Sequence, residues 1–203
     1  KILTWALSKG EKLFFFPDQH LGRNTCFQLG IALAEMVVYN PQLPNGGLTA
    51  EQVKKAKVIL WYGYCSVHQG FTPEHILQAK ILYPDSIVVV HPECSHEVFK
   101  QADHSGSTAY IVELIKSAAP GSRFWVGTEI NLVNRLAKEN PDKSIRSLSP
   151  YQCLCTTMYR VRPRWLLRSL QAIADGRPIN VVQVPDDCRK NALLALNTML
   201  QIS

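Results

Sequence analysis

Residues 13–24 read LFFFPDQHLGRN, and this stretch decides the fold class. Four apolar residues in a row stop at Pro17-Asp18, and a stretch of helical character, residues 24–38, follows soon after. A short apolar run that ends at a proline or glycine is typical of a strand buried on both faces of a parallel sheet. The stretch therefore predicts one strand and one helix of an α/β unit.

The same pattern recurs along the chain. Further strand-length apolar runs occupy residues 58–62, 87–90 and 124–126, and helical patterns occupy residues 73–82, 108–117 and 130–140. Alternating strands and helices predict tandem, similar three-layer α/β units with right-handed crossovers, followed by a helical tail at 163–203. We expect the first unit to cover residues 1–67, the second 68–158 and the tail region 159–203.

Composition narrows the class of protein. The 203 residues are 46% apolar and 19% charged, which is ordinary for a globular chain and excludes long disorder. The net charge of +6 suits anionic small molecules as well as nucleic acid. Neither a membrane-length apolar run nor a signal-peptide pattern is found, so we expect a cytoplasmic protein (or an organellar one, such as a plastid protein, in a plant) with no membrane partner. The first residue is Lys1, and we expect a fragment of a longer chain.

Polar side chains follow each predicted strand. The segments 17–20, 63–68, 91–94 and 127–129 together carry two cysteines, three histidines and two glutamates. Ligands of open parallel sheets bind beyond the carboxyl ends of the strands, so these segments are the place to look for chemistry. Carboxylates and imidazoles in such a place are suited to acid–base work.

The cysteines do not have the paired spacing of a zinc site. Cys65 and Cys155 each stand alone at the end of a predicted element. Widely separated single thiolates fit a site assembled between domains, as in some iron–sulfur proteins. The spacing alone does not decide between an iron–sulfur site and a purely structural role for these cysteines.

Six motifs in order carry a resemblance to a known family. They are FFFPDQHLGRN, WYGYCSVH, HPEC, ADHSGST, GTE and CTTM, and the match covers nearly the whole chain, residues 13 to about 200. In this order they resemble the quinolinate synthase family, over the C-terminal two thirds of that enzyme. The resemblance implies condensation of iminoaspartate with dihydroxyacetone phosphate to quinolinate, phosphate and water, on the route to NAD.

The resemblance also implies a cofactor. The family holds a [4Fe-4S] cluster with three cysteines, one from each of three similar α/β domains, and the open iron acts as a Lewis acid. Cys65 and Cys155 match two of these ligands, and the third lies upstream of this chain. Cys153 is the alternative to Cys155, whereas Cys94 is expected to be a small buried residue.

Substrate-binding residues follow from the same motifs. Glu93 is the leading proton-transfer group, and His68 and His91 match groups that bind or polarise substrate oxygens. Ser107 and Thr108, at the start of a predicted helix, match residues that hold a carboxylate or phosphate, and backbone N–H groups there favour an anion. The partners implied are the two anionic substrates, with functional coupling to L-aspartate oxidase.

Two other function classes stay open. Arginines around Trp165 could bind nucleic acid, although a solvated basic helix face that packs its tryptophan inward is the commoner arrangement. A non-catalytic scaffold that keeps the fold without the cluster is the other alternative.

The remaining polar residues have plainer expected roles. Asp18 and Asn24 are expected to shape a loop, and Glu129 to cap a helix or orient its neighbours. Cys26 and Cys188 are expected to pack, and surface or helix-capping roles are expected for His75, His96 and His104.

Overall fold

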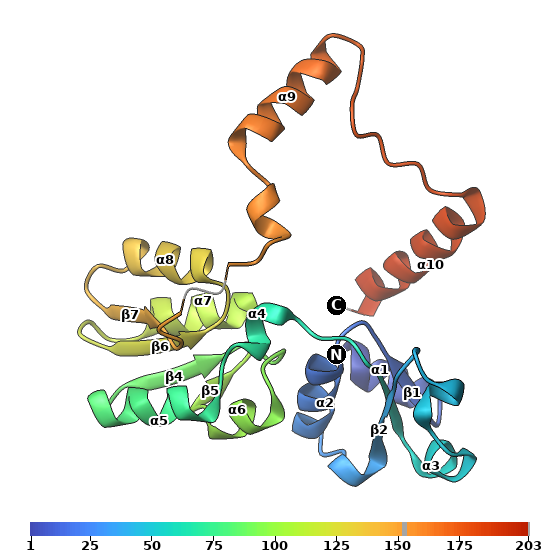
Figure 1. Ribbon diagram of the computed structural model, residues 1–203, viewed down its shortest axis with the longest axis horizontal. Helices are drawn as coiled ribbons and strands as arrows, with labels where there is room; N and C mark the ends of the chain where they lie inside the picture. The colour runs from blue at the N-terminus through green and yellow to red at the C-terminus, as the bar shows by residue number, and fades with distance from the viewer. Residues whose placement is uncertain (152–153, 203) are drawn as a thin grey trace. The chain divides into compact units, whose positions relative to one another are not determined.

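The computed structural model describes residues 1–151 and 154–202 and has a mixed α/β architecture with two parallel sheets (Figure 1). Its contacts divide the chain into two units. One is residues 11–154, which contains both sheets, and the other is residues 1–10 together with 155–203. The predicted α/β class with parallel strands and a helical tail is confirmed.

The first sheet has the strand order β1-β3-β2, with every neighbouring pair parallel. The apolar runs 13–16 and 58–62 form two of its strands, as predicted. The elements of this part are β1 (Leu13–Phe15), α2 (Gln19–Gln28), η1 (Leu33–Glu35), β2 (Met36–Tyr39), η2 (Pro44–Gly47), α3 (Ala50–Lys55) and β3 (Val58–Trp61).

The helix predicted over residues 24–38 is wrong. The real helix, α2, starts earlier and ends at Gln28, and Gly30 follows with φ of 85°, a left-handed conformation that stops a helix. The sequence Met-Val-Val-Tyr of β2 then pairs with β3. β-branched and aromatic residues favour a pleated, half-buried strand over a helix, which explains the difference.

Close packing of α2 on the first sheet depends on a glycine. A Cβ atom at Gly22 would lie 2.5 Å from Phe15 Cδ1 and 2.6 Å from Leu60 Cδ2. The helix can therefore approach β1 and β3 only because residue 22 has no side chain. This contact fixes the position of the first turn of α2 relative to the strand ends.

The second sheet has the order β5-β4-β6-β7, again parallel throughout. Figure 1 shows α7 and α8 on one side of it and α5 and α6 on the other. Its elements are α4 (Ser66–Gln69), α5 (Pro73–Leu82), β4 (Ile87–Val90), α6 (His96–Gln101), β5 (His104–Ser105), α7 (Thr108–Ser117), β6 (Arg123–Gly127), α8 (Ile130–Glu139) and β7 (Ser144–Ser147). The sequence did not predict β5 or β7, because both are short, polar edge strands without an apolar run.

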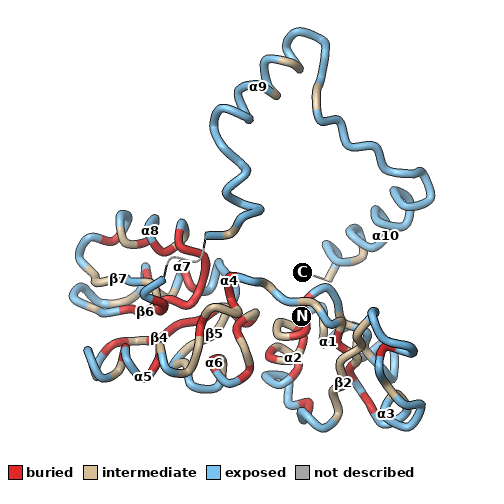
Figure 2. The backbone as a smooth tube through the Cα atoms, viewed as in Figure 1, coloured by how far each residue is buried: buried red, intermediate tan, exposed pale blue. Residues whose placement is uncertain are grey.

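The main core of this part lies between the second sheet and the helices α7 and α8. Buried residues are concentrated on the strands and on the inward sides of the helices (Figure 2). One buried cluster comprises Val89, Ile111, Ile115, Phe124, Val126, Ile130, Val133, Leu136 and Ile145. Such packing makes β4 and β6 a rigid base for the loops at their carboxyl ends.

The second unit is mainly helical and exposed. It contains α1 (Ile2–Lys9), η3 (Met158–Arg160), α9 (Pro163–Ala174) and α10 (Asp186–Ile202). No residue of these four elements is buried. Among the described residues, no helix combines the length and apolar character that crossing a membrane requires.

Candidate functional site

The candidate site lies where strands of both sheets end. Cys65 and α4 follow β3, the turn at residues 91–94 follows β4, and Thr128 follows β6. The carboxyl ends of parallel strands share an edge within each sheet, and here the ends of β3 and of β4 and β6 from the two sheets face the same site. The structure brings together Cys65, His68, His91 and Glu93 from the predicted site.

Glu93 is the centre of this group. Its Oε2 atom lies 2.9 Å from His68 Nδ1 and 3.8 Å from His91 Nδ1. The two imidazole rings are stacked, with centroids 4.8 Å apart and planes at 24°. One carboxylate oxygen is therefore within reach of two imidazoles, an arrangement that can hold and transfer a proton.

The pKa values of Glu93 and His91 are both lowered, but for different reasons. Contact with the His68 ring lowers the pKa of Glu93 below its ordinary value, although burial acts in the opposite direction. Burial lowers the pKa of His91, and the neighbouring His68 lowers it further. At neutral pH these shifts favour an ionised Glu93 beside a neutral His91, so both groups are in the state that can accept a proton.

Cys65 joins this group through its own side chain. Cys65, His68 and Glu93 each offer one atom that could bind a metal, and these three atoms all lie within 4.8 Å of one another. A thiol, an imidazole and a carboxylate are all ligands for transition metals. These three residues are therefore able to take part in a metal centre.

Asp18 positions the Cys65 backbone. Its Oδ1 accepts hydrogen bonds from the N–H groups of His20 and Leu21, both at 2.8 Å, as the N-cap of α2. Its Oδ2 accepts from the Cys65 N–H at 3.0 Å. The expected loop-shaping role of Asp18 thus extends to a residue 47 positions further along the chain.

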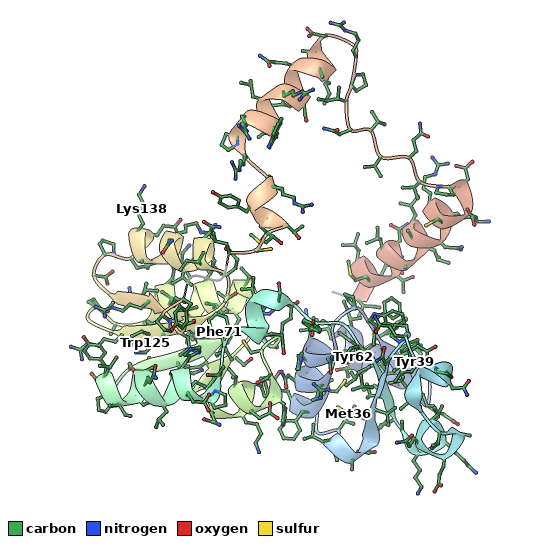
Figure 3. All side chains as sticks on the ribbon, in the orientation of Figure 1. Met36, Tyr39, Tyr62, Phe71, Trp125 and Lys138 are labelled. Carbon is green, nitrogen blue, oxygen red and sulfur yellow. The ribbon has the colours of Figure 1, made fainter. Side chains whose placement is uncertain are left out.

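Thr128, for which no individual role was predicted, completes the surroundings of His68. Thr128 Oγ1 lies 3.3 Å from His68 Nε2, on the side of the ring opposite Glu93. Phe71, labelled in Figure 3, is buried with its ring centroid 6.4 Å from that of His68. The position of Thr128 directly after a strand is the signal that could have identified it.

A tight turn carries His91 and Glu93. The Cys94 N–H donates to the His91 carbonyl at 3.0 Å, and the His91 N–H donates to the Gly127 carbonyl at 3.0 Å. Asn24, fully buried on α2, donates from Nδ2 to the carbonyls of Pro92 at 2.8 Å and Cys94 at 2.9 Å. Asn24 therefore fixes the backbone on both sides of Glu93.

His96 continues this network, and the expectation of a surface histidine is wrong for it. The residue is 8% exposed, and its Nδ1 lies 2.8 Å from Asn24 Oδ1. It is the first residue of α6, so its ring links α6 to α2. His75 does cap a helix, with Nδ1 accepting from the Thr72 N–H at 3.2 Å, and partly exposed His104 contacts Tyr110.

The two buried cysteines are packing residues, as expected. Cys94 is fully buried with its Sγ 3.6 Å from the Gly127 carbonyl oxygen, and burial raises its thiol pKa strongly. Burial also raises the thiol pKa of Cys26 to about 11. Both thiols are thereby kept protonated and poorly nucleophilic. Cys188, expected to pack as well, is instead exposed on α10.

Ser107 and Thr108 lie at the exposed start of α7. Ser107 is the N-cap and accepts from the Tyr110 N–H at 3.3 Å. The preceding Gly106 donates its N–H to the Val90 carbonyl at 3.2 Å, directly before the turn that carries Glu93. The two hydroxyl residues therefore follow the same strand edge as the histidines. Glu129, as expected, caps α8 by accepting from the Asn131 N–H at 2.8 Å.

Cys155 belongs to the other unit. It is partly exposed, and its Sγ accepts a hydrogen bond from the Met158 N–H at 3.4 Å. Its alternative, Cys153, lies outside the described residues. The assignment of Cys155 as a metal ligand stays a prediction, as do the roles expected for the other site residues.

The basic segment of the tail differs from its expected arrangement. Trp165 is 45% exposed instead of packed inward. The guanidinium groups of Arg164 and Arg168 lie 4.6 Å and 6.0 Å from its ring centroid. Arg162 lies 4.4 Å from the ring centroid of Tyr159 in the same way. These three arginines therefore each contact an aromatic ring of the tail.

The fold and site define a parallel α/β protein with a thiol–imidazole–carboxylate centre at its strand ends. A family model described as quinolinate synthetase A protein matches residues 1–201. The chain therefore belongs to the quinolinate synthetase A family, and the resemblance in the sequence motifs is confirmed.

Curated relatives agree with this assignment. A quinolinate synthase of Listeria monocytogenes is 50% identical over 203 residues, which is 100% of this chain and 55% of that protein. Quinolinate synthases of Herpetosiphon aurantiacus and Anoxybacillus flavithermus are 49% and 48% identical, over 100% and 98% of this chain and 54% of each relative. The chain thus spans about half the length of the curated relatives it matches.

Proposed function

We propose that this chain supplies part of a quinolinate synthase, which condenses iminoaspartate with dihydroxyacetone phosphate to quinolinate, phosphate and water in NAD biosynthesis. The observation that supports this most is the position of Glu93, within 2.9 Å of His68 and 3.8 Å of His91 beside Cys65. These residues belong to motifs that match the family. The reaction requires several proton transfers, and this group is suited to them.

The cofactor of this proposal is a [4Fe-4S] cluster held by Cys65, Cys155 and a third cysteine outside this chain. The two thiols fit such a group. Cys65 is partly exposed at a strand end beside ionisable groups, and Cys155 accepts a backbone N–H bond of the kind that tunes cluster thiolates. When bound, the cluster would supply a Lewis-acidic iron that polarises a substrate oxygen.

The roles proposed for the protein groups follow from their charges. Glu93, held ionised, accepts a proton from the substrate carbon framework, and its contact with His68 offers that proton an onward path. His91, with its lowered pKa, stays neutral and donates or accepts a hydrogen bond at a substrate oxygen. Thr128 orients the His68 ring through Nε2.

The anionic ends of the substrates need cationic or N–H partners. We assign them to the first turn of α7, where the hydroxyl groups of Ser107 and Thr108 and the backbone N–H groups of the helix start favour a carboxylate or phosphate. Iminoaspartate is unstable in water, so functional coupling to an L-aspartate oxidase that supplies it is part of the same proposal.

The test uses the full-length protein, reconstituted anaerobically with iron and sulfide. Cys65→Ser and Cys155→Ser are expected to abolish the brown cluster absorption, whereas Cys94→Ser is expected to keep it. Glu93→Gln is expected to keep the cluster and lose turnover by about 10²-fold or more, as loss of a general acid–base group does. Cluster loss in Cys94→Ser alone, or normal turnover in Glu93→Gln, would contradict the proposal.

A further inference from the structure

We propose that, when no cluster is bound, Cys65, His68 and Glu93 hold a single divalent transition-metal ion, with Zn²⁺ as the best match. This site shares only Cys65 with the proposed cluster. It rests on the contacts within residues 11–154 and needs neither Cys155 nor a cysteine outside this chain. It therefore stands or falls separately from the proposed function.

The donor set is the first argument. A thiolate sulfur, an imidazole nitrogen and a carboxylate oxygen are the three kinds of atom that bind Zn²⁺ in proteins, and three protein ligands leave a fourth position for water. Mg²⁺ and Ca²⁺ prefer oxygen atoms only, so the thiol and imidazole argue against them. These three donor atoms therefore favour a borderline-soft ion such as Zn²⁺.

The distances are the second argument. The three ligand atoms all lie within 4.8 Å of one another. Tetrahedral Zn²⁺ with bonds of about 2.0–2.3 Å places its ligands about 3.3–3.8 Å apart. Closing the site around an ion thus requires side-chain shifts on the order of 1 Å, within the reach of the partly exposed Cys65 and Glu93.

The state of His68 is the third and independent argument. Its side chain is 8% exposed, and its buried Nδ1 faces Glu93 Oε2 without meeting the geometry of an aligned hydrogen bond. The 2.9 Å approach to Glu93 Oε2 has the length of an ion pair but not the alignment of a hydrogen bond. An ion placed between Nδ1 and the carboxylate would bond to both of these buried groups in place of their misaligned pairing.

The supporting contacts are those of a metal site. Metal-bound histidines usually pair their second ring nitrogen with an outer partner that fixes the ring, and Thr128 Oγ1 occupies that position 3.3 Å from Nε2. Asp18 fixes the backbone of Cys65 through the N–H bond. The ligands are thus oriented before an ion arrives.

A consequence of this site is that the bound ion and the proposed cluster compete for the sulfur of Cys65. An ion bound to Cys65 removes a thiolate that the cluster needs, so Zn²⁺ is expected to block cluster assembly. Conversely, an assembled cluster is expected to exclude the ion from this site.

The experiment titrates the metal-free, reduced chain with Co²⁺, an optical reporter for Zn²⁺ sites. We expect one equivalent to bind, with a thiolate-to-cobalt charge-transfer band that Zn²⁺ removes by displacement. Cys65→Ser is expected to abolish the band. His68→Gln and Glu93→Gln are each expected to weaken Co²⁺ binding by at least about 10-fold. Thr128→Ala is expected to weaken it by about 10-fold, because it removes the contact that orients the His68 ring.

Matched controls separate this site from the cluster and from chance thiol binding. Cys94→Ser, in the neighbouring turn, and Cys155→Ser are expected to bind Co²⁺ as the parent chain does. A band that survives Cys65→Ser, or disappears in Cys155→Ser, would overturn the inference. If His68→Gln does not fold, as judged by circular dichroism, the folded Thr128→Ala variant decides, and unchanged affinity there would overturn the inference.

Cluster reconstitution of the same variants in the full-length protein keeps the two proposals distinguishable. Cys155→Ser is expected to lose the cluster and keep the Co²⁺ site. His68→Gln is expected to do the opposite. A parent protein that forms the cluster but binds no Co²⁺ when metal-free would remove the mononuclear site and leave the proposed function standing.

Discussion

Asp18 accepts a hydrogen bond from the backbone N–H of Cys65 at 3.0 Å, although 47 residues separate the two in sequence. The other oxygen of the same carboxylate caps α2. One buried side chain therefore sets both the start of a helix and the position of the site cysteine. This dual use explains a carboxylate that is only 5% exposed at the end of β1.

Replacing this carboxylate is expected to affect stability and metal binding together. Asp18→Ala removes a helix cap, worth about 1 kcal/mol, and leaves the Cys65 N–H without its acceptor, at a cost of about 1–3 kcal/mol. Urea unfolding followed by circular dichroism measures the sum. Asp85→Asn, at an exposed ion pair with Arg123, is the control and is expected to cost less than about 1 kcal/mol. Equal losses in both variants would contradict the assigned role of Asp18.

Asn24 is expected to be among the most sensitive polar positions. Asn24→Ala leaves the carbonyls of Pro92 and Cys94 and the ring of His96 without their partner, and unsatisfied buried groups cost about 1–3 kcal/mol each. We expect a loss of at least about 3 kcal/mol in the free energy of unfolding. Amide hydrogen exchange is expected to speed up in residues 91–96 first.

The control for this change is Asn40→Ala, which loses only an exposed hydrogen bond to the Gln42 N–H. Its expected cost is below about 1 kcal/mol. If exchange in residues 91–96 is as slow in Asn24→Ala as in the parent chain, Asn24 does not hold the turn that carries Glu93.

The strands and helices with clear apolar patterns could be predicted from the sequence. Buried runs such as residues 87–90 have no polar position, and their ends at proline or glycine give the boundaries directly. The polar edge strand β7 and the strand β2 could not be found in this way. Residues 36–39 are an apolar, β-branched run, but they directly follow a helix-like stretch, and pairing with β3 decides that they form a strand.

For the site, strand-end position predicted which residues gather but not what holds them. Cys65 and His68 follow β3 of the first sheet, and His91 and Glu93 follow β4 of the second, so each pair lies at the carboxyl end of its own sheet. Asn24 reaches the turn from the middle of α2, across 68 residues of sequence to Pro92. No spacing rule connects a helix interior to a distant turn, because the contact depends on how α2 and α6 pack together.

Gly63 is expected to tolerate no side chain. A Cβ atom there would lie 2.0 Å from the Pro17 carbonyl oxygen, a backbone atom that cannot rotate away. Gly63→Ala is therefore expected to separate the two strand-end loops, lower the unfolding free energy by about 1–3 kcal/mol as overpacking does, and weaken Co²⁺ binding at Cys65. Gly10→Ala, at an exposed residue with extended backbone, is the control and is expected to change neither measurement. A Gly63→Ala chain with parental stability would show that the two loops are not in close contact.

The buried ring of His96 is expected to make the fold sensitive to acid. Burial lowers its pKa, and its Nε2 has no hydrogen-bond partner among the described residues, so a proton there would add a poorly solvated charge that nearby Glu97 offsets only in part. Because the folded-state pKa is below the ordinary value of about 6.5, the stabilisation is fully present above that pH and is lost as the pH falls through the folded-state pKa.

Urea unfolding at pH 7.5, 6.5 and 5.5 is expected to show stability falling with pH, by up to about 1.4 kcal/mol per pH unit for this one proton. Burial lowers the pKa of His20 and His91 as well, so they add to the slope with the same sign. His96→Gln is expected to reduce the slope by its own share, and an unchanged slope in that variant would exclude His96 as a source of the acid sensitivity.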